Sequence, residues 1–390
     1  MIGIFFISRI NLSSGRTNVY NAVKTCEALN SQNGFEAKFI TTDQPKDVDK
    51  FFQRQGIRKT FELICLGLTN TSSKYIGYKW HELWWIILTN SYFVWYFWKK
   101  RREFDVLYFR DGTLSPSAVL AKFFLGKKIF FESHSVLQNK YAQFFNWISV
   151  RFTDGVIAIS SGLKDHYQKI NRNIILSLCS AAEDSWFNYS RDKYSFREEL
   201  KLPTDKFLIG YTGVVGPNPN GDVYEVDDIL RSLKNLPENV VLVIVGEING
   251  NAEWLRIIAK EEKVSNRIII YPWQERSIIP RFLQAFDAVL IPRRKKDLIG
   301  DSPAKMFPAL ASHRPIIAGR AECIEEVLTD GMDAATVKTN SPEGWKEAIL
   351  KVYESTDFSR KISDRAIETS YQYTWEKRGG QISAFIAKSL

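Results

Sequence analysis

Cysteine is scarce in this 390-residue sequence and forms no short motif. The four cysteines lie far apart along the chain, at Cys26, Cys65, Cys179 and Cys323. The absence of any C-x-x-C pair argues against a zinc site, and the spacing gives no disulfide framework. We therefore expect a reducing, cytoplasmic compartment and no bound metal.

Long apolar runs are also missing. No run reaches the roughly 20 apolar residues that a membrane-spanning helix requires. The opening residues MIGIFFISRI lack the basic segment of a signal peptide and are typical of a short strand. We expect neither a leader peptide nor a spanning anchor.

The sequence is nevertheless rich enough in apolar residues to fold into more than one domain. Its length favours two domains, and 45% hydrophobic residues can supply two cores. The net charge of +9 suits phosphorylated ligands, an anionic membrane surface or nucleic acid. Nucleic-acid binding has the least support, because the basic residues are not interleaved with aromatic residues in a recognised module.

The first half reads as alternating strands and helices. Residues 2–7 predict a strand that leads through a small-residue loop, residues 11–16, into a helix, which is a Rossmann-like opening. In this loop Gly15 permits close approach of the backbone to a ligand, and Arg16 can contact phosphate or an acceptor. The alternative is an ordinary tight turn between strand and helix.

Two further predicted strands, residues 105–110 and 128–134, end in polar residues. In an open α/β sheet the ligand lies at the carboxyl ends of the strands. His134 is therefore a candidate functional residue, although a lone histidine is more often structural.

Residues 84–98, WWIILTNSYFVWYFW, have the most unusual composition in the chain. A helix that is apolar on nearly all sides is buried or lies in lipid, and at about 22 Å this one is too short to span a bilayer. Tryptophan beside basic residues is typical of the membrane interface. We predict membrane contact over a purely buried core helix, through Trp84, Trp85, Trp95, Trp98, Lys99, Lys100, Arg101 and Arg102.

The second half alternates in the same way. Its apolar runs predict strands, and segments of helical length lie between them at residues 223–235, 252–263 and 277–286. Such alternation predicts a parallel sheet with crossover helices, and so a second Rossmann-like domain.

Ser302 followed by Pro303 predicts the start of a helix, because serine caps a free N–H and proline fits the first turn. Lys305 then falls in the first turn, where the helix dipole disfavours a cation. An anion there would explain this placement, since backbone donors and one ammonium make a phosphate site.

Residues 302–331, SPAKMFPALASHRPIIAGRAECIEEVLTDG, resemble the nucleotide-binding segment of glycosyltransferase family 4, in its Ser-Pro-x-Lys-x-Phe variant. The resemblance implies an α/β GT-B fold, two Rossmann-like domains with parallel sheets facing across a cleft. It places an acceptor-side domain at 1–185, a nucleotide-sugar-binding domain at 186–370, and a helix at 371–390 that returns to the first domain.

The same resemblance implies a function. Members of the family transfer a sugar, with retention of configuration, from a nucleotide-sugar donor to an acceptor, with no metal or other cofactor. For this chain the expected acceptor is a glycan or lipid-linked molecule in surface polysaccharide assembly, at the inner face of the membrane. His134 and Asp301 are the expected catalytic residues, and the donor would contact Gly15, Arg16, Gly213, Trp273, Arg293, Ser302 and Lys305. For Trp273, the alternative to stacking on the base is a plug at the domain edge.

Three positions depart from the family pattern. Val214 and Asn220 stand where the family commonly has an arginine and a lysine, and Pro308 replaces a glutamate that binds ribose. The alternative function is therefore a catalytically weak or silent protein that binds nucleotide-sugar within such an assembly. A sugar-nucleotide epimerase is a third possibility, but no matching set of carboxylates and histidine marks it.

Overall fold

The computed structural model describes residues 1–12, 17–44, 47–57, 59–68, 79–136, 140–178, 180–183, 192–215, 225–248, 250–293 and 304–390, without the side chains of 79–82. The chain forms two compact units. The first comprises the chain up to Cys179 together with Trp375–Leu390, and the second comprises most of the chain between.

The first unit is built on a 7-stranded parallel sheet of order β3-β2-β1-β4-β5-β6-β7. Its strands are β1 (Ile2–Ser8), β2 (Phe35–Thr41), β3 (Glu62–Cys65), β4 (Val106–Phe109), β5 (Lys128–Ser133), β6 (Gly155–Ala158) and β7 (Ile174–Leu176). Its helices are α1 (Thr17–Asn30), α2 (Val48–Gln55), α3 (Lys79–Lys99), α4 (Ser115–Leu125), α5 (Lys140–Phe152), α6 (Ser161–Tyr167) and α15 (Trp375–Ala387).

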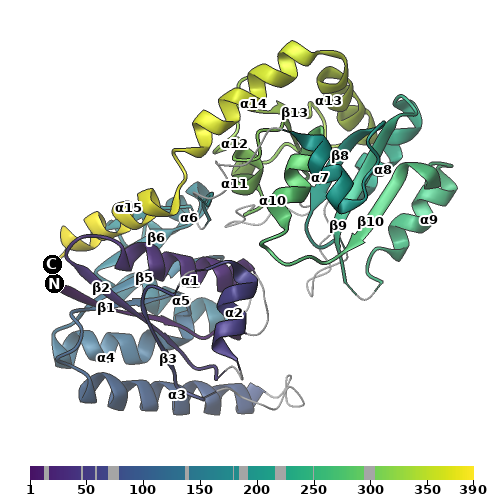
Figure 1. Ribbon diagram of the computed structural model, residues 1–390. Coiled ribbons are helices and arrows are strands. Elements are labelled where there is room, and N and C mark those ends of the chain that lie inside the picture. Colours follow the sequence, from purple (N-terminus) through teal and green to yellow (C-terminus); the bar gives the residue numbers. More distant parts are fainter. Residues whose placement is uncertain are drawn as a thin grey trace. The chain divides into compact units, whose positions relative to one another are not determined.

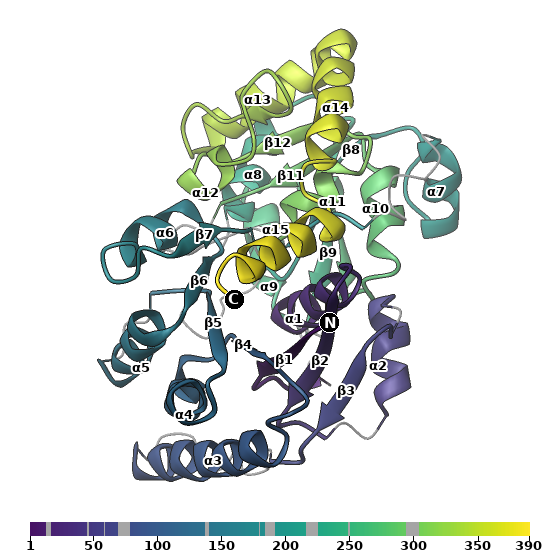
Figure 2. The same cartoon turned by 90° about the vertical axis from the view of Figure 1, so that its left-hand side faces the viewer.

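Helices cover both faces of this sheet. Figures 1 and 2 show α3, α4 and α5 on one side, with α1 and α15 on the other. Alternation along β5 decides which side chain faces which layer: Phe131 joins the core under α3, whereas Phe130 packs edge-on against Phe385 of α15. A Cβ at Gly379 of α15 would lie 2.4 Å from the Ala28 carbonyl oxygen, so the close approach of α15 to α1 requires glycine there.

The second unit contains a 6-stranded parallel sheet of order β10-β9-β8-β11-β12-β13. Its strands are β8 (Phe207–Thr212), β9 (Val240–Glu247), β10 (Ile268–Pro272), β11 (Ala288–Ile291), β12 (Ile316–Ala318) and β13 (Ala335–Thr336). Its helices are α7 (Lys193–Leu200), α8 (Val226–Ser232), α9 (Glu253–Glu261), α10 (Ile279–Ala285), α11 (Met306–Leu310), α12 (Glu322–Glu325), α13 (Pro342–Glu354) and α14 (Thr356–Ser370).

The structure corrects two predicted helix starts. The aromatic helix begins at Lys79, ahead of the predicted residue 84. The helix expected from Ser302 begins at Met306, and Lys305 is its N-cap residue and not part of its first turn. Pro308 explains the later start: proline lacks an N–H, which a helix begun at Ser302 would need at that position. Starting at Met306 places Pro308 in the first turn, where N–H groups have no helical partner.

Candidate functional site

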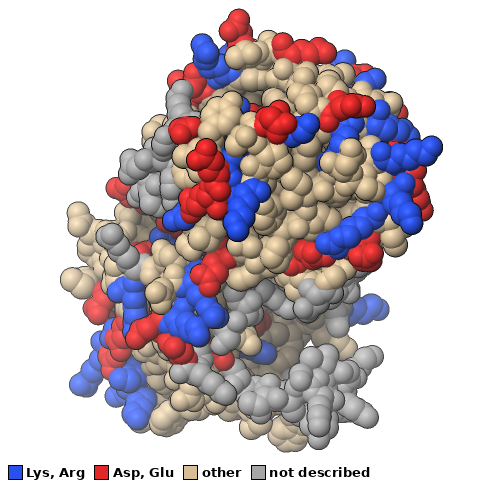
Figure 3. Space-filling view, turned by 45° about the vertical axis from the view of Figure 1, so that its right-hand side comes forward, with Lys and Arg blue, Asp and Glu red and all other residues tan. Residues whose placement is uncertain are grey.

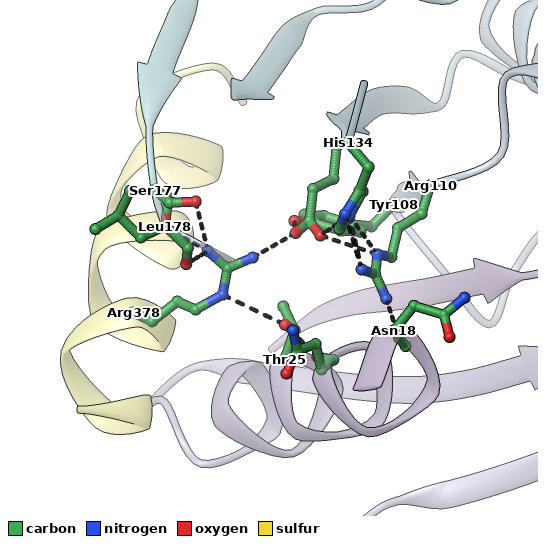
Figure 4. Close-up of polar contacts among 10 residues, drawn as sticks. Asn18, Thr25, Tyr108, Arg110, His134, Ser177, Leu178 and Arg378 are labelled. Carbon is green, nitrogen blue, oxygen red and sulfur yellow. Dashed lines mark hydrogen bonds and ion pairs between the residues drawn. The ribbon is translucent and has the colours of Figure 1, made fainter. Parts of the chain in front are cut away.

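In the first unit, a buried carboxylate organises the strand ends. Glu132 of β5 is fully buried, and its Oε2 lies 2.6 Å from Arg378 Nη2 of α15. Tyr108 of β4 donates its hydroxyl to the same oxygen, and Oε1 lies 2.9 Å from Arg110 Nε (Figure 4). The two guanidinium groups outweigh the effect of burial and hold the pKa of Glu132 well below its usual range, so this carboxylate remains charged.

Arg378 also connects its own helix, α15, to the end of β7 and to α1. It donates to the backbone oxygens of Ser177 and Leu178 at the end of β7 and to the Thr25 hydroxyl of α1 (Figure 4). Its side chain is only 4% exposed. Arg378 therefore both attaches α15 to the sheet and compensates the charge of Glu132.

His134 follows β5 and lies between opposite charges. Its Nε2 is 2.6 Å from Glu132 Oε1 and 2.9 Å from Arg110 Nε. Desolvation, with the charge of Arg110 added, lowers the pKa of His134 from 6.5 to about 4. The imidazole is therefore neutral near pH 7, with 28% of the side chain exposed. It can exchange a hydrogen bond with a ligand but brings no positive charge.

Acidification should destabilise the first unit through His134. Between pH 6.5 and about 4 the unfolded chain binds a proton that the folded chain does not, so stability is complete above this window and falls through it. The expected loss is about 3 kcal/mol, at 1.36 kcal/mol for each pKa unit. Thermal unfolding between these two pH values should show a steeper fall for the wild type than for His134→Gln. Parallel curves would contradict the assignment.

In the second unit the candidate residues lie where the strand order reverses. β8 and β11 are neighbours, although β9 follows β8 in the chain, and ligands of open α/β sheets bind at such a switch point. Gly213 follows β8 with φ 150°, a conformation that favours glycine. A Cβ there would lie 2.8 Å from the Tyr211 hydroxyl and 3.2 Å from Lys305 Nζ, so Gly213 leaves room for both groups.

Tyr211 holds the Lys305 ammonium. Lys305 Nζ donates to the Tyr211 hydroxyl at 2.7 Å and lies 4.4 Å from the centre of its ring. The hydroxyl in turn donates to the Val214 carbonyl at 3.2 Å. Because Tyr211 is fully buried, it fixes the ammonium beside the loop that follows β8.

Arg293 is held at the end of the neighbouring strand. Its Nε is 2.8 Å from Oε1 of Glu225, which is almost fully buried. A Cβ at Gly319, after β12, would lie 2.9 Å from the Arg293 backbone nitrogen, so glycine is needed for this packing. The ion pair with Glu225 therefore holds the Arg293 guanidinium in place just after β11.

The remaining donor-side predictions stay predictions. Trp273 is 46% exposed after β10, which is compatible with stacking on a base and leaves the alternative of a plug at the domain edge open. Val214 is exposed beside Gly213 and supplies no charge, and Pro308 is buried. Gly15, Arg16, Asn220, Asp301 and Ser302 lie outside the described residues.

The predicted membrane helix, α3, has two different faces. Phe93 and Phe97 are buried in the core, whereas Trp84, Trp95 and Trp98 are 62%, 49% and 58% exposed. Trp85 is half-buried, Lys99, Arg101 and Arg102 are exposed, and Lys100 pairs with Glu103 at 2.7 Å. Within the described part of the chain, no helix is both long and apolar enough to cross a bilayer.

Positive charge is not gathered on the face shown in Figure 3, where Lys and Arg alternate with Asp and Glu. Proteins that bind nucleic acid typically present a continuous basic patch or stripe. This face therefore gives no support to nucleic-acid binding. Among the described residues, no group of three or more His, Cys, Asp or Glu side chains is placed to hold a metal ion.

The sequence did not reveal the residues that hold His134 in the first unit, or Lys305 and Arg293 in the second. Arg378, Tyr108 and Glu225 were not predicted to act, and no local pattern distinguishes them. Tyr211 stands two residues before Gly213, but only folding brings it to Lys305. Glu132 carried a usable signal, since alternation along β5 points it to the same side as Phe130, toward α15.

The second unit is similar in sequence to known glycosyltransferases. Residues 192–369, which fall in the second unit, match the family described as glycosyl transferases group 1. Over 186 residues the chain is 25% identical to the D-inositol 3-phosphate glycosyltransferase of Xylanimonas cellulosilytica, an alignment that covers 47% of this chain and 42% of that protein. A Nocardioides protein of the same name is 24% identical over 203 residues, covering 49% and 43%. The chain thus matches less than half the length of these curated relatives.

Solved structures are similar along the whole chain. A glycosyltransferase from Rickettsia africae superposes with a TM-score of 0.75 and 16% identity, covering 100% of this chain and 98% of that one. Anabaena HepE, solved with UDP and glucose, gives a TM-score of 0.74 and 14% identity, with 100% of both chains covered. These similarities confirm the predicted GT-B fold of two Rossmann-like halves. The family match and the names of the relatives support a glycosyltransferase.

Proposed function

We propose that this protein is a glycosyltransferase that moves a sugar from a nucleotide-sugar donor to an acceptor. The match of residues 192–369 to glycosyl transferases group 1 carries the proposal. It covers the part of the chain in which Lys305 and Gly213 meet at the switch point of the sheet. At Gly213 the absence of a side chain lets the backbone approach a ligand closely, and the Lys305 ammonium is held beside it. This combination suits the diphosphate of such a donor.

The main chemical burden of the reaction is the departing nucleoside diphosphate. Its negative charge increases as the bond to the sugar breaks, and fixed donors stabilise that charge better than water does. We assign this task to Lys305, with Arg293, Arg16 and the backbone beside Gly15 and Ser302 as further donors. Because Tyr211 already holds the ammonium, little reorganisation is needed when the charge develops.

The sugar and base would be held by other groups. Asp301 accepts hydrogen bonds from donor hydroxyls, and the exposed Trp273 indole stacks on the base. The neutral imidazole of His134 hydrogen-bonds the sugar or the acceptor. We propose transfer with retention of configuration and without a metal or other cofactor.

The proposed acceptor is a glycan or lipid-linked molecule of surface polysaccharide assembly. One structural neighbour is a lipopolysaccharide outer core galactosyltransferase, WaaB, at 16% identity and a TM-score of 0.69, covering 100% of both chains. We further propose that the exposed side of α3 contacts the inner face of the membrane through its tryptophans and basic residues. Flotation with vesicles that contain an anionic lipid tests this contact.

A titration with nucleotides tests the transferase proposal. UDP, GDP, ADP and their sugars are added to the full chain, and thermal unfolding is followed. A ligand at 100 times its Kd stabilises the native state by about 2.7 kcal/mol, so one nucleoside diphosphate should raise Tm by a few degrees. The matching nucleotide-sugar should then be hydrolysed slowly without acceptor.

Two results would change this proposal. A Tm that responds to none of these nucleotides would overturn donor binding altogether. Binding of a nucleotide-sugar without hydrolysis or transfer would instead identify the silent, sugar-nucleotide-binding alternative. That alternative is based on Val214, Asn220 and Pro308, which stand where the family commonly has charged residues.

A further inference from the structure

An apolar groove runs between α3 and α4, which lie side by side in both ribbon views (Figures 1 and 2). Its volume is about 520 Å³, within the range of small-molecule sites. Its lining combines small and large side chains: Ser91, Trp95 and Trp98 from α3, with Ser117, Leu120 and Phe124 from α4.

The groove walls are unusually exposed for such side chains. Phe124 is 79% exposed, Trp98 58% and Trp95 49%. α5, on the same side of the sheet, adds Tyr141 at 71% and Phe144 at 57%. α4 lies against both α3 and α5, so these exposed apolar side chains lie on neighbouring helices, and an apolar surface of this kind marks an interaction site.

Two basic side chains, Lys99 and Arg101, lie against the tryptophans that line the groove. Lys99 Nζ lies 4.9 Å from the centre of the Trp95 ring, and the Arg101 guanidinium lies 4.9 Å from that of Trp98. Arg101 also donates to the Trp98 carbonyl at 2.9 Å. The same two tryptophans therefore line the groove and position cations at its rim, so apolar and anionic groups of one ligand can be bound together.

We propose that this groove binds one hydrocarbon chain of an anionic membrane lipid, with the lipid phosphate at Lys99 and Arg101. The inference deepens the proposed membrane contact of α3 and rests on it. A second copy of this protein is a poorer occupant, because pairing through this face would bring basic rims together. An anionic lipid matches both features of the groove, since its chain is apolar like the lining and its headgroup is opposite in charge to Lys99 and Arg101.

Binding of straight-chain alkyl phosphates, below their micelle concentrations, tests the groove. Affinity for the full chain, measured by calorimetry, should rise about fourfold for each added methylene group. The rise should stop once the chain exceeds the groove. Alkyl trimethylammonium ions of equal length should bind more weakly, and Arg101→Glu should remove this preference.

A matched pair of substitutions on α4 locates the binding. Leu120 lines the groove and is 40% exposed, whereas Phe123 is 65% exposed and is not part of the lining. Leu120→Trp should weaken alkyl phosphate binding at least about tenfold by filling the groove. Phe123→Trp should stay within about twofold. Ser91→Trp repeats the block from α3 and guards against a folding defect in Leu120→Trp.

Three results would overturn the proposal that this groove binds a lipid chain. The first is equal binding by Leu120→Trp, Ser91→Trp and the wild type, and the second is an affinity that does not depend on chain length. The third is a concentration-dependent dimer in sedimentation that Leu120→Trp dissociates, which would assign the face to a second copy. Flotation with phosphatidylglycerol vesicles and donor hydrolysis are measured in parallel. If both persist while alkyl phosphates fail to bind, the groove proposal fails and the proposed function stands.

Discussion

Replacing Lys305 by alanine is expected to weaken binding of the nucleoside diphosphate by about 10- to 100-fold, because a hydrogen bond to a charged group contributes about 1.5–3 kcal/mol. Loss of transfer should be larger, about 10²- to 10³-fold, since charge on the leaving group grows in the transition state. Calorimetry with the nucleotide identified by thermal shift, and steady-state transfer rates, measure the two effects.

Variants around Lys305 separate charge from position. Lys305→Arg keeps the charge and should retain part of the binding, whereas Tyr211→Phe keeps the ring but removes the hydroxyl that accepts from Nζ, and should show an intermediate loss. Lys260→Ala, an exposed lysine of α9, is the matched control and should behave as wild type. If Lys305→Ala binds the nucleotide as tightly as Lys260→Ala, the phosphate site lies elsewhere.

Breaking the buried cluster of the first unit should have the largest effect on stability. Arg378→Met removes one compensating charge from the buried Glu132 carboxylate and releases α15 from Ser177 and Leu178. Removing one partner of a buried ion pair costs about 3–5 kcal/mol. Arg378→Lys should not restore stability, because an ammonium cannot reproduce the several directed bonds of the guanidinium.

The control for this change is an exposed arginine on the preceding helix. Arg365 of α14 pairs with Glu368, both more than half exposed, and such surface pairs contribute about 0–1 kcal/mol. Urea unfolding of Arg378→Met, Arg365→Met and the double variant Glu132→Gln/Arg378→Met gives the comparison. The double variant should be at least as unstable as the single Arg378→Met, because it also leaves the Arg110 guanidinium, whose side chain is 6% exposed, without its carboxylate partner. A double variant that is more stable than Arg378→Met would show that Arg110 does not depend on this carboxylate.

The layered fold was predictable because its signal is local. Buried parallel strands read as short apolar runs, and the strands predicted at 105–110 and 128–134 are found as β4 and β5. The start of α11 was predicted wrongly because the capping preferences of Ser302 and Pro303 were given more weight than the constraint from Pro308, which is the third residue of the observed helix.

The candidate site was only partly predictable. His134 and Lys305 were proposed from their places after a strand and in a family-like motif. Desolvation and the charge of Arg110, 24 residues away, keep His134 neutral, whereas Tyr211, 94 residues away, holds the Lys305 ammonium. No periodicity or spacing encodes such pairs.

The sequence by itself determined the alternation of strand and helix, the family-like segment at 302–331 and the apolar, tryptophan-rich character of α3. Only the tertiary structure decided which of those tryptophans stay exposed and that α4 completes a groove beside them. It also decided that two arginines keep Glu132 charged, and that burial beside Arg110 keeps His134 neutral. The physical reason is range: backbone preference and hydrophobic period act over a few residues, whereas burial and charge compensation depend on whatever folding brings within a few ångströms.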